Sequence, residues 1–208
     1  MKSTGVFSPS INAAAVVIAG FLFLAPFSLR AATVTFSAAN EIAQQNSAFS
    51  LPIDVSGFST VSSFQFTLQW DPGVLTFASE GNFANIGGFT SGNFGTASVS
   101  SGKLTVSWDD PNFATDGGGV SLADGSSLFS LNFTATGNTG LHSDVDFVDI
   151  PTAREVTIQG NLETFFSVSG GVDVTPVPEP SIAALGCLGL AVTVRGFARR
   201  IRAGRAIS

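Results

Sequence analysis

One stretch of the chain decides its fold: Phe64-Gln65-Phe66-Thr67-Leu68-Gln69-Trp70-Asp71-Pro72-Gly73-Val74-Leu75. Apolar and polar residues alternate up to Trp70, so an extended backbone would place the apolar side chains on one face and the polar ones on the other. Pro72 lacks the N–H group that a strand ladder needs, so the strand ends at the Asp-Pro-Gly turn. The stretch therefore predicts two half-buried β-strands joined by a turn.

The same period of two recurs along the middle of the chain. Apolar side chains alternate with polar ones in six further runs: Phe49, Leu51, Ile53 and Val55; Leu104, Val106 and Trp108; Phe129, Leu131, Phe133 and Ala135; Val145 and Phe147; Val156 and Ile158; and Phe166, Val168 and Val172. Turn signals rich in Gly, Asn and Asp separate the runs, and sustained helical periodicity is absent. We predict an all-β fold for residues 33–175, an antiparallel β-sandwich of eight to nine strands.

The composition of this middle domain restricts its partners. Residues 33–175 contain fourteen acidic and two basic side chains, a formal charge of −12. Such a domain repels nucleic acid, so we expect no nucleic-acid partner. The only cysteine, Cys187, lies outside the domain, in an apolar run where a small apolar side chain is its expected role. The domain must therefore depend on its core rather than on disulfides.

The N-terminal residues 1–32 have the three parts of a secretory signal peptide. Lys2 supplies the charged region, an apolar stretch follows over residues 13–27, and small residues end the segment. We expect this segment to form a signal helix that is cleaved near Ala31 or Ala32. The alternative is an N-terminal membrane anchor that remains attached.

The C-terminal residues 176–208 combine three features of a membrane-sorting segment. A proline-rich spacer carries the motif Val177, Pro178, Glu179, Pro180 and Ser181. The apolar residues 182–194 that follow predict a short transmembrane helix, marginal for a hydrocarbon core of about 30 Å. Five arginines come next, and we assign a role in membrane topology to the first four: Arg195, Arg199, Arg200 and Arg202. Because basic residues favour the cytoplasmic side, we expect the precursor to be anchored in the inner membrane with its domain in the periplasm.

The ordered set of motif, short apolar helix and terminal arginines resembles the PEP-CTERM sorting signal of Gram-negative bacteria. The resemblance covers about the last thirty residues. It implies recognition and cleavage at Pro178-Glu179-Pro180 by an exosortase, a membrane cysteine protease-transpeptidase, and an association with exopolysaccharide production. The processed domain would then lie at the cell surface or outside the cell. The alternative is a plain tail anchor.

Catalytic chemistry has little support in this sequence. The single histidine, His142, lies near Ser143 and Asp144, but a Ser-His-Asp site needs a poised serine, and the chain has no nucleophile-elbow motif. One histidine and one cysteine in an apolar segment also make a zinc site improbable. We expect no enzyme activity and no organic cofactor.

Calcium is the inorganic ligand that the acidic loops suit best, because it prefers several carboxylate and carbonyl oxygens on irregular backbone. Asp109, Asp110 and Asp116 form the candidate calcium cluster. Residues Asp144, Asp146 and Asp149 form a second acidic cluster, and neither group has EF-hand spacing. The alternative is that both are solvated acidic loops.

Two tryptophans raise the possibility of sugar binding, because aromatic faces stack on pyranose rings. Trp70 and Trp108, however, continue the apolar phase of their strands, so we expect both side chains to point into the core. Any sugar contact would then use exposed loop phenylalanines or the Gln, Ser and Thr faces of the strands. The ligand-binding residues remain unassigned by the sequence.

The order of these strand and turn signals resembles the cohesin-like family, whose sandwich is related to certain carbohydrate-binding modules. The resemblance spans residues 34–174 and rests on the runs 64–75, 102–108 and 128–133. It implies a jelly-roll sandwich and, in cohesins, dockerin recognition on a variable sheet face, with no partner-binding residue transferable by motif. Our leading hypothesis is a non-enzymatic exported surface or matrix protein that binds exopolysaccharide or another surface protein. The alternatives are a true cohesin that captures a dockerin and an unrecognised hydrolase.

Overall fold

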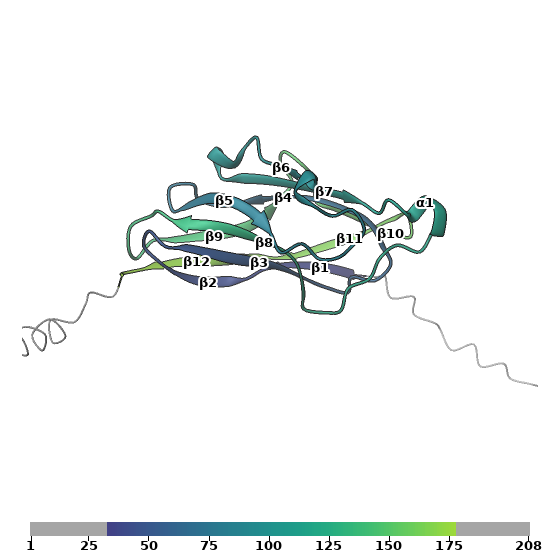
Figure 1. The fold of residues 1–208 in the computed structure, drawn as a ribbon, viewed down its shortest axis with the longest axis horizontal. Helices are drawn as coiled ribbons and strands as arrows, with labels where there is room; N and C mark the ends of the chain where they lie inside the picture. The colour runs from purple at the N-terminus through teal and green to yellow at the C-terminus, as the bar shows by residue number, and fades with distance from the viewer. Residues whose placement is uncertain (1–32, 178–208) are drawn as a thin grey trace, which may run out of the picture. The chain divides into compact units, whose positions relative to one another are not determined.

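A computed structural model of the chain describes residues 33–177, and these residues fold into β-strands connected by loops, short 3₁₀ turns and one short helix (Figure 1). The strands are β1 (Thr33–Ala38), β2 (Asn40–Gln44), β3 (Ala48–Ser56), β4 (Val61–Gln69), β5 (Leu75–Gly81), β6 (Phe94–Gly95), β7 (Lys103–Asp109), β8 (Ser126–Ala135), β9 (His142–Val148), β10 (Glu155–Ile158), β11 (Asn161–Val168) and β12 (Gly170–Thr175). The other elements are the 3₁₀ turns η1 (Ser91–Asn93) and η2 (Val99–Ser101) and the helix α1 (Phe113–Asp116). The all-β prediction is confirmed.

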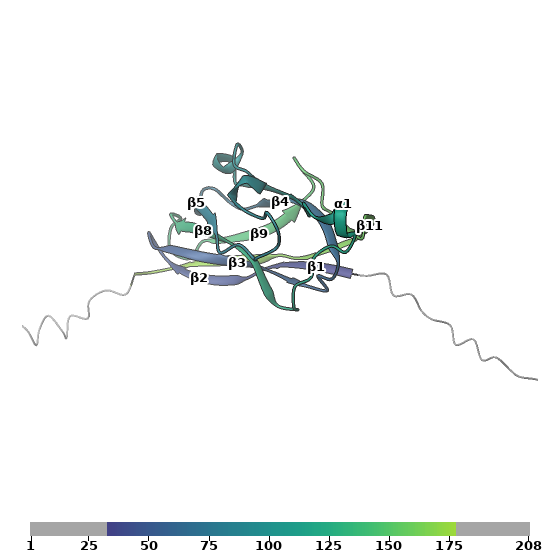
Figure 2. The same cartoon turned by 45° about the vertical axis from the view of Figure 1, so that its right-hand side comes forward.

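The strands form two packed layers. One layer has the strand order β11-β1-β3-β8-β5. The other is centred on β4, which pairs with β7 on one side and with both β9 and β10 on the other. Figure 2 shows β4 and β9 lying in a layer above β1, β2 and β3. Because β11 also pairs with β10, the two layers are joined along one side.

The structure has twelve strands where eight to nine were predicted, because three long strands are interrupted. The breaks fall at Ala39 between β1 and β2, at residues 149–154 between β9 and β10, and at Ser169 between β11 and β12. The first and last strands keep the same register across the breaks at Ala39 and Ser169. Thr33 on β1 lies opposite Thr164 on β11, and Asn40 on β2 lies opposite Gly171 on β12, which is the same offset in residue number.

This pairing of the first and last strands is parallel, which corrects the prediction of a purely antiparallel sandwich. A parallel pair has no hairpin between its strands, so no local turn signal announces it in the sequence. The parallel direction also determines where the chain enters and leaves. In Figure 1, β1 begins at one end of the domain and β12 ends at the opposite end.

The core is a continuous cluster of phenylalanine rings between the layers. Phe66 on β4 is fully buried, and its ring lies within 6.4 Å of the rings of Phe36, Phe129, Phe147 and Phe165. Those four rings come from β1, β8, β9 and β11. The Phe66 side chain on β4 thus packs against side chains from four other strands. Aromatic pairs at these distances add to the stabilisation that burial alone provides.

Both tryptophans are buried, as the alternation of their strands predicted. Trp108 stacks on Phe64 at 5.3 Å, and its Nε1 donates a hydrogen bond of 2.8 Å to the carbonyl oxygen of Gly87. Trp70 packs between Phe77 and Phe133. Neither indole face is therefore available as a platform for a sugar ring.

The phase of β11 differs from the prediction. Phe165 points inward and stacks on Phe36 at 4.6 Å, whereas Phe166 is 49% exposed and Val168 is 55% exposed. The prediction that Phe166, Val168 and Val172 all point inward is thus wrong for Phe166 and Val168. The interruption at Ser169 resets the alternation, and of these three residues only Val172, which lies in β12, is buried.

The targeting segments fall almost entirely outside the described residues. The signal helix over 1–32, the motif residues from Pro178 onward, the short apolar helix and the arginines are all in that category, as is Cys187. Val177, the first motif residue, is exposed at the end of the described chain. Within residues 33–177, no helix is long and apolar enough to cross a membrane.

Candidate functional site

The outer faces of the two layers differ sharply in charge. On the layer β11-β1-β3-β8-β5, outward positions are mostly Ser, Thr and Asn, and Asp54 is the one ionisable residue among the outward positions of the paired strands. The opposite outer face, built by β7, β4, β9, β10 and β12, carries seven: Lys103, Asp109, His142, Asp144, Asp146, Glu155 and Asp173. We call this second surface the charged face.

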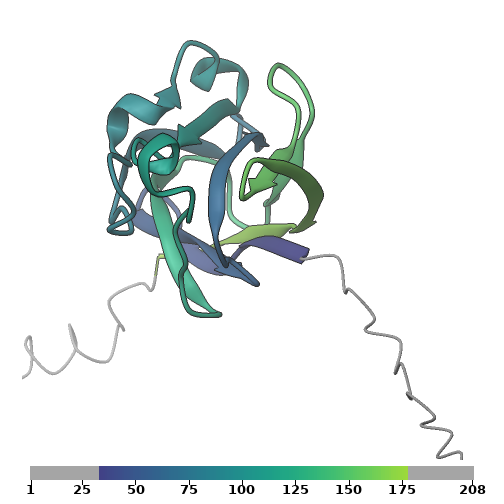
Figure 3. The same ribbon diagram turned by 90° about the vertical axis from the view of Figure 1, so that its right-hand side faces the viewer.

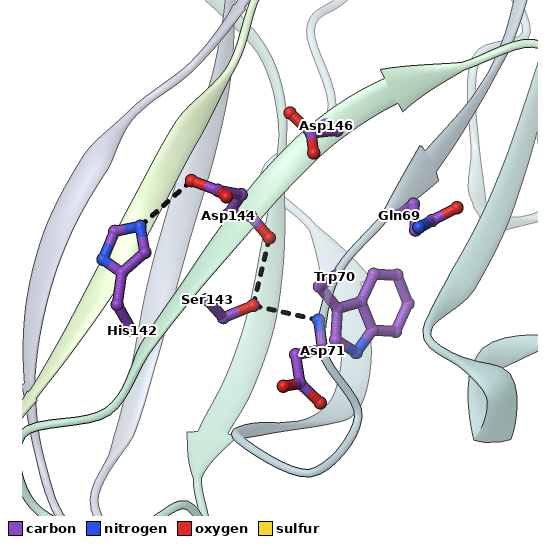
Figure 4. Close-up of a pocket in the computed structure, with 7 residues that line it drawn as sticks. All are labelled: Gln69, Trp70, Asp71, His142, Ser143, Asp144 and Asp146. Carbon is purple, nitrogen blue, oxygen red and sulfur yellow. Dashed lines mark hydrogen bonds and ion pairs between the residues drawn. The ribbon is translucent and has the colours of Figure 1, made fainter.

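The histidine of the charged face is clamped between two carboxylates. His142 Nδ1 lies 2.8 Å from Asp173 on the paired strand β12, and its Nε2 lies 3.0 Å from Asp144 on β9. Figure 4 shows the contact with Asp144. The ring lies over Gly171, where an added Cβ would come within 2.5 Å of it. These side chains meet because residues 142 and 173 are directly opposite in the antiparallel ladder.

The same residues line a polar hollow of about 280 Å³ at the end of β4 and β9. Its lining consists of Gln69, Trp70, Asp71, His142, Ser143, Asp144 and Asp146. Figure 4 shows His142, Asp144 and Asp146 along β9, with Gln69 and Trp70 opposite them on the β4 side. The hollow is rich in carboxylates.

The arrangement around the histidine is not that of a nucleophilic site. Ser143 is buried, and its Oγ accepts a hydrogen bond from the backbone N–H of Asp71 and donates one to the carbonyl oxygen of Asp144. Both ring nitrogens of His142 are engaged by carboxylates, so neither is directed at a serine. A general base must lie within hydrogen-bonding distance of its nucleophile, and His142 and Ser143 do not satisfy that geometry.

The carboxylates raise the pKa of His142 above its usual 6.5, the hydrogen bond with Asp173 contributing most and that with Asp144 next. A neutral imidazole can donate one hydrogen bond, whereas the protonated ring donates two, so the clamp favours the cation. Stabilisation by the clamp is thus complete below about pH 6.5, the unfolded-state pKa, and is lost as pH rises through the folded-state pKa.

We therefore expect His142→Asn to lower the melting temperature of the protein more at pH 5.5 than at pH 8.5. The neighbouring acids Asp71, Asp144, Asp146 and Asp173 are present in both the wild type and the variant, so the comparison isolates the loss of the imidazole. Thermal unfolding of wild type and variant at both values measures the effect. An equal loss at both pH values would show that protonation of the ring makes no contribution.

The expected calcium cluster does not come together. Asp109 is exposed at the end of β7, Asp110 accepts a hydrogen bond from the N–H of Asn112, and Asp116 accepts one from the N–H of Gly118. Both are local turn contacts that a side-chain carboxylate makes with backbone two residues ahead. Across residues 33–177, no three His, Cys, Asp or Glu side chains form a group that could hold a metal ion.

Addition of millimolar calcium to the metal-free chain is therefore expected to leave its melting temperature unchanged, because a ligand stabilises only the state that binds it. The comparison needs calcium and chelator arms at matched ionic strength. A magnesium arm controls for screening of the acidic surface. A calcium-specific rise would indicate a site that these geometries do not show.

The second acidic cluster is divided by the structure. Asp144 and Asp146 lie on the charged face, whereas Asp149 begins the loop between β9 and β10, residues 149–154, which we call the flap. Asp149 makes a two-pronged ion pair with Arg154, at 2.9 Å from Nε and 3.0 Å from Nη2. The guanidinium lowers the pKa of the Asp149 carboxyl below its usual range.

The flap is attached to the charged face at its centre. The N–H of Thr152 donates a 2.9 Å hydrogen bond to Thr67 Oγ1, and that hydroxyl donates one of 2.9 Å to the Thr152 carbonyl oxygen. Lys103 extends from β7 to the carbonyl oxygen of Ile150 at 3.2 Å. Figure 3 shows the green loop that follows β9 projecting beyond the strands of its layer. Sequence reasoning missed the flap, since the Asp149–Arg154 pair fits no strand or helix period.

Comparison with protein families decides the affiliation of the domain. The family model described as the cohesin domain matches residues 32–174. The chain belongs to the cohesin domain family. No match was found among curated proteins.

Solved structures agree with this assignment at the level of the fold. A type I cohesin–dockerin complex from Clostridium thermocellum aligns with TM-score 0.58 at 14% identity, covering 71% of this chain and 97% of the other. The sixth cohesin of scaffoldin B from Acetivibrio cellulolyticus, in complex with a dockerin, gives 0.56 at 21%, covering 68% and 99%. A non-cellulosomal cohesin from the archaeon Archaeoglobus fulgidus gives 0.54 at 20%, covering 74% and 97%. The cohesin fold predicted from residues 64–75 and its companions is confirmed.

Proposed function

We propose that this cohesin domain is a non-catalytic module that captures a partner protein of the dockerin type. The observation that carries the proposal is the family match over residues 32–174, because the cohesin family consists of non-catalytic protein-binding domains. A true cohesin, one of the alternatives from the sequence, is thus favoured over a module that binds exopolysaccharide. Two of the similar structures named above are complexes with dockerins, which supports this choice of partner class.

The charged face is the surface best suited to this role. Specific, non-obligate protein interfaces combine an apolar centre with a polar and charged rim. The charged face has both: Ile150 is exposed on the flap, Lys103 donates to its carbonyl oxygen, and Asp146 and Glu155 lie on β9 and β10, the two strands that the flap joins. The hydroxyl-rich opposite face has exposed apolar residues on β11 but almost no charge with which to orient a partner.

Binding of exopolysaccharide is the rival function. The two side chains best suited to stack on sugars are those of Trp70 and Trp108, and both are buried, so neither can serve as a stacking platform. The hydroxyl and amide side chains of the opposite face remain as a possible contact surface for a neutral glycan.

We also propose that the module works outside the cytoplasm. The motivation is in the sequence alone: a signal peptide over 1–32, and the sorting segment over 176–208 with its Val177–Ser181 motif and terminal arginines. The exosortase would act as a processing partner. Mass spectrometry of the protein purified from its host tests this proposal, since it predicts loss of both end segments. An exported product that keeps its arginine-rich tail would contradict the sorting proposal.

The binding proposal is tested by titrating the full-length chain, in parallel, with purified dockerin modules encoded in the same genome and with a glycan array. We expect saturable binding to at least one dockerin and no saturable glycan binding. Binding to glycans without any dockerin would overturn the proposal in favour of its rival.

A further inference from the structure

The flap presents an apolar side chain that the fold itself does not use. Ile150 is 70% exposed, although full burial of such a side chain would contribute about 1.5–3 kcal/mol. It lies on the flap that joins β9 to β10, beside a face whose outward strand positions are mostly polar. A single exposed apolar residue is common on protein surfaces, and what distinguishes Ile150 is the way the flap holds its backbone.

The backbone on both sides of Ile150 is fixed by contacts with three strands. Thr152 exchanges two hydrogen bonds with Thr67 on β4, and Thr67 is fully buried beneath the flap. Lys103 on β7 donates to the carbonyl oxygen of Ile150 itself. Arg154 closes the base of the flap through Asp149 and also donates to Ser167 on β11 at 3.3 Å. The flap is therefore ordered before any partner arrives, and ordering it on binding would carry little entropic cost.

The charges around the flap indicate which kind of residue the partner would carry around the pocket that receives Ile150. Asp144 and Asp146 on β9, Glu155 on β10 and Asp173 on β12 give the face a negative rim, and Lys103 is engaged with the flap. A partner surface with lysine or arginine at its rim would complement this arrangement and would be steered toward it. Energetic hot spots are anchors of this kind, one buried side chain within a polar ring.

We propose that Ile150 is the specificity-determining anchor of this cohesin domain, inserting into an apolar depression that basic residues surround on the dockerin-type partner. The proposal rests on the proposed function. Asp149 and Arg154 are positioning residues, since they act through the flap. Discrimination among dockerins would then depend on whether their surface offers that depression.

The test measures the affinity of the full-length chain for the dockerin that binds it. Ile150→Ala is expected to weaken binding by about 10-fold or more, the range of hot-spot residues. Ile42→Ala is the matched control on the same face: Ile42 is 73% exposed on β2 beside Asp173, and β12 and β9 separate β2 from the strand β4 that holds the flap. Phe166→Ala probes the opposite face. Both of these variants are expected to bind within about 2-fold of wild type. Unchanged melting temperatures would exclude misfolding, since all three side chains are exposed.

The outcomes separate this inference from the proposed function. If the wild-type chain binds no dockerin, both fail. If it binds and Ile150→Ala leaves the affinity unchanged, the anchor is wrong while the proposed function stands. Loss of binding on Phe166→Ala alone would move the interface to the opposite face.

A salt titration tests the charged rim. We expect binding of the wild-type chain to weaken as salt is raised from about 0.05 to 0.5 M. The double variant that carries both Asp144→Asn and Asp146→Asn is expected to show a less steep salt dependence. An identical salt dependence would remove the basic rim from the proposal.

Discussion

Replacing Phe66 with alanine is expected to lower the free energy of unfolding by about 4 kcal/mol, within the range for buried aromatic residues. The side chain is fully buried, and four strands contribute rings that pack against it, so the cavity left behind cannot close by movement of a single neighbour. A loss of this size is a large part of the 5–15 kcal/mol that stabilises a typical domain. Urea unfolding followed by tryptophan fluorescence measures it, because both reporter indoles are buried.

Phe166→Ala is the matched control, since it deletes the same atoms from a side chain that is 49% exposed. Its expected cost is below about 1 kcal/mol, as for surface substitutions in general. The pair of variants also tests the phase of β11. If Phe166→Ala were as damaging as Phe66→Ala, the inward residue of that strand would be 166 rather than 165, contrary to the structure.

Gly170→Ala is expected to destabilise the domain by about 3 kcal/mol or more, at or beyond the upper end of the usual overpacking cost. A Cβ on Gly170 would overlap the carbonyl oxygens of Ala38 and Ala39, approaching the first to 2.6 Å. Both obstacles are backbone atoms at the joint between β1 and β2, so no side chain can rotate away. The substitution therefore forces apart the first and last strands, which pair on both sides of this residue, at 33–37 with 164–168 and at 40–44 with 171–175.

Gly118→Ala provides the control for that substitution. Its nearest atom would be the Asp116 side chain at 4.0 Å, and the turn that contains it lies in the loop after α1. We expect a change in melting temperature of less than about 2 °C for this variant and a clear loss for Gly170→Ala. Equal tolerance of both would mean that the two terminal strands are not in close contact at residue 170.

Much of the fold could be predicted from local pattern. The alternation over residues 64–70 placed Trp70 in the core, and the same rule correctly placed Trp108. The alternation of apolar and polar residues does not predict burial correctly where a strand is interrupted. The side chains that point inward switch from odd to even positions there, and no sequence signal marks the change. Phe165 and Phe166 are adjacent and chemically identical, so only the packing of Phe165 on Phe36 decides which of them is buried.

The site was less accessible to sequence reasoning because it is built from long-range contacts. His142 and Asp173 are 31 residues apart, and Thr67 and Thr152 are 85 apart. The strand register brings His142 and Asp173 together, and β12, which carries Asp173, pairs in parallel with the start of the domain. Thr152 meets Thr67 because the flap folds back over β4. The sequence grouped the acidic residues as candidate calcium ligands or solvated loops, and their separation into a clamp, a rim and a flap pair required the structure.

Amide hydrogen exchange on the full-length chain, with and without the dockerin that binds it, tests the central claim most directly. A module that captures its partner on the charged face should show slowed exchange in the flap at residues 149–154 and in β4 and β9. Exchange in β11 and in residues 33–37 of β1, on the opposite face, should be unchanged. Protection confined to β11, or no protection in the presence of any dockerin, would contradict the account.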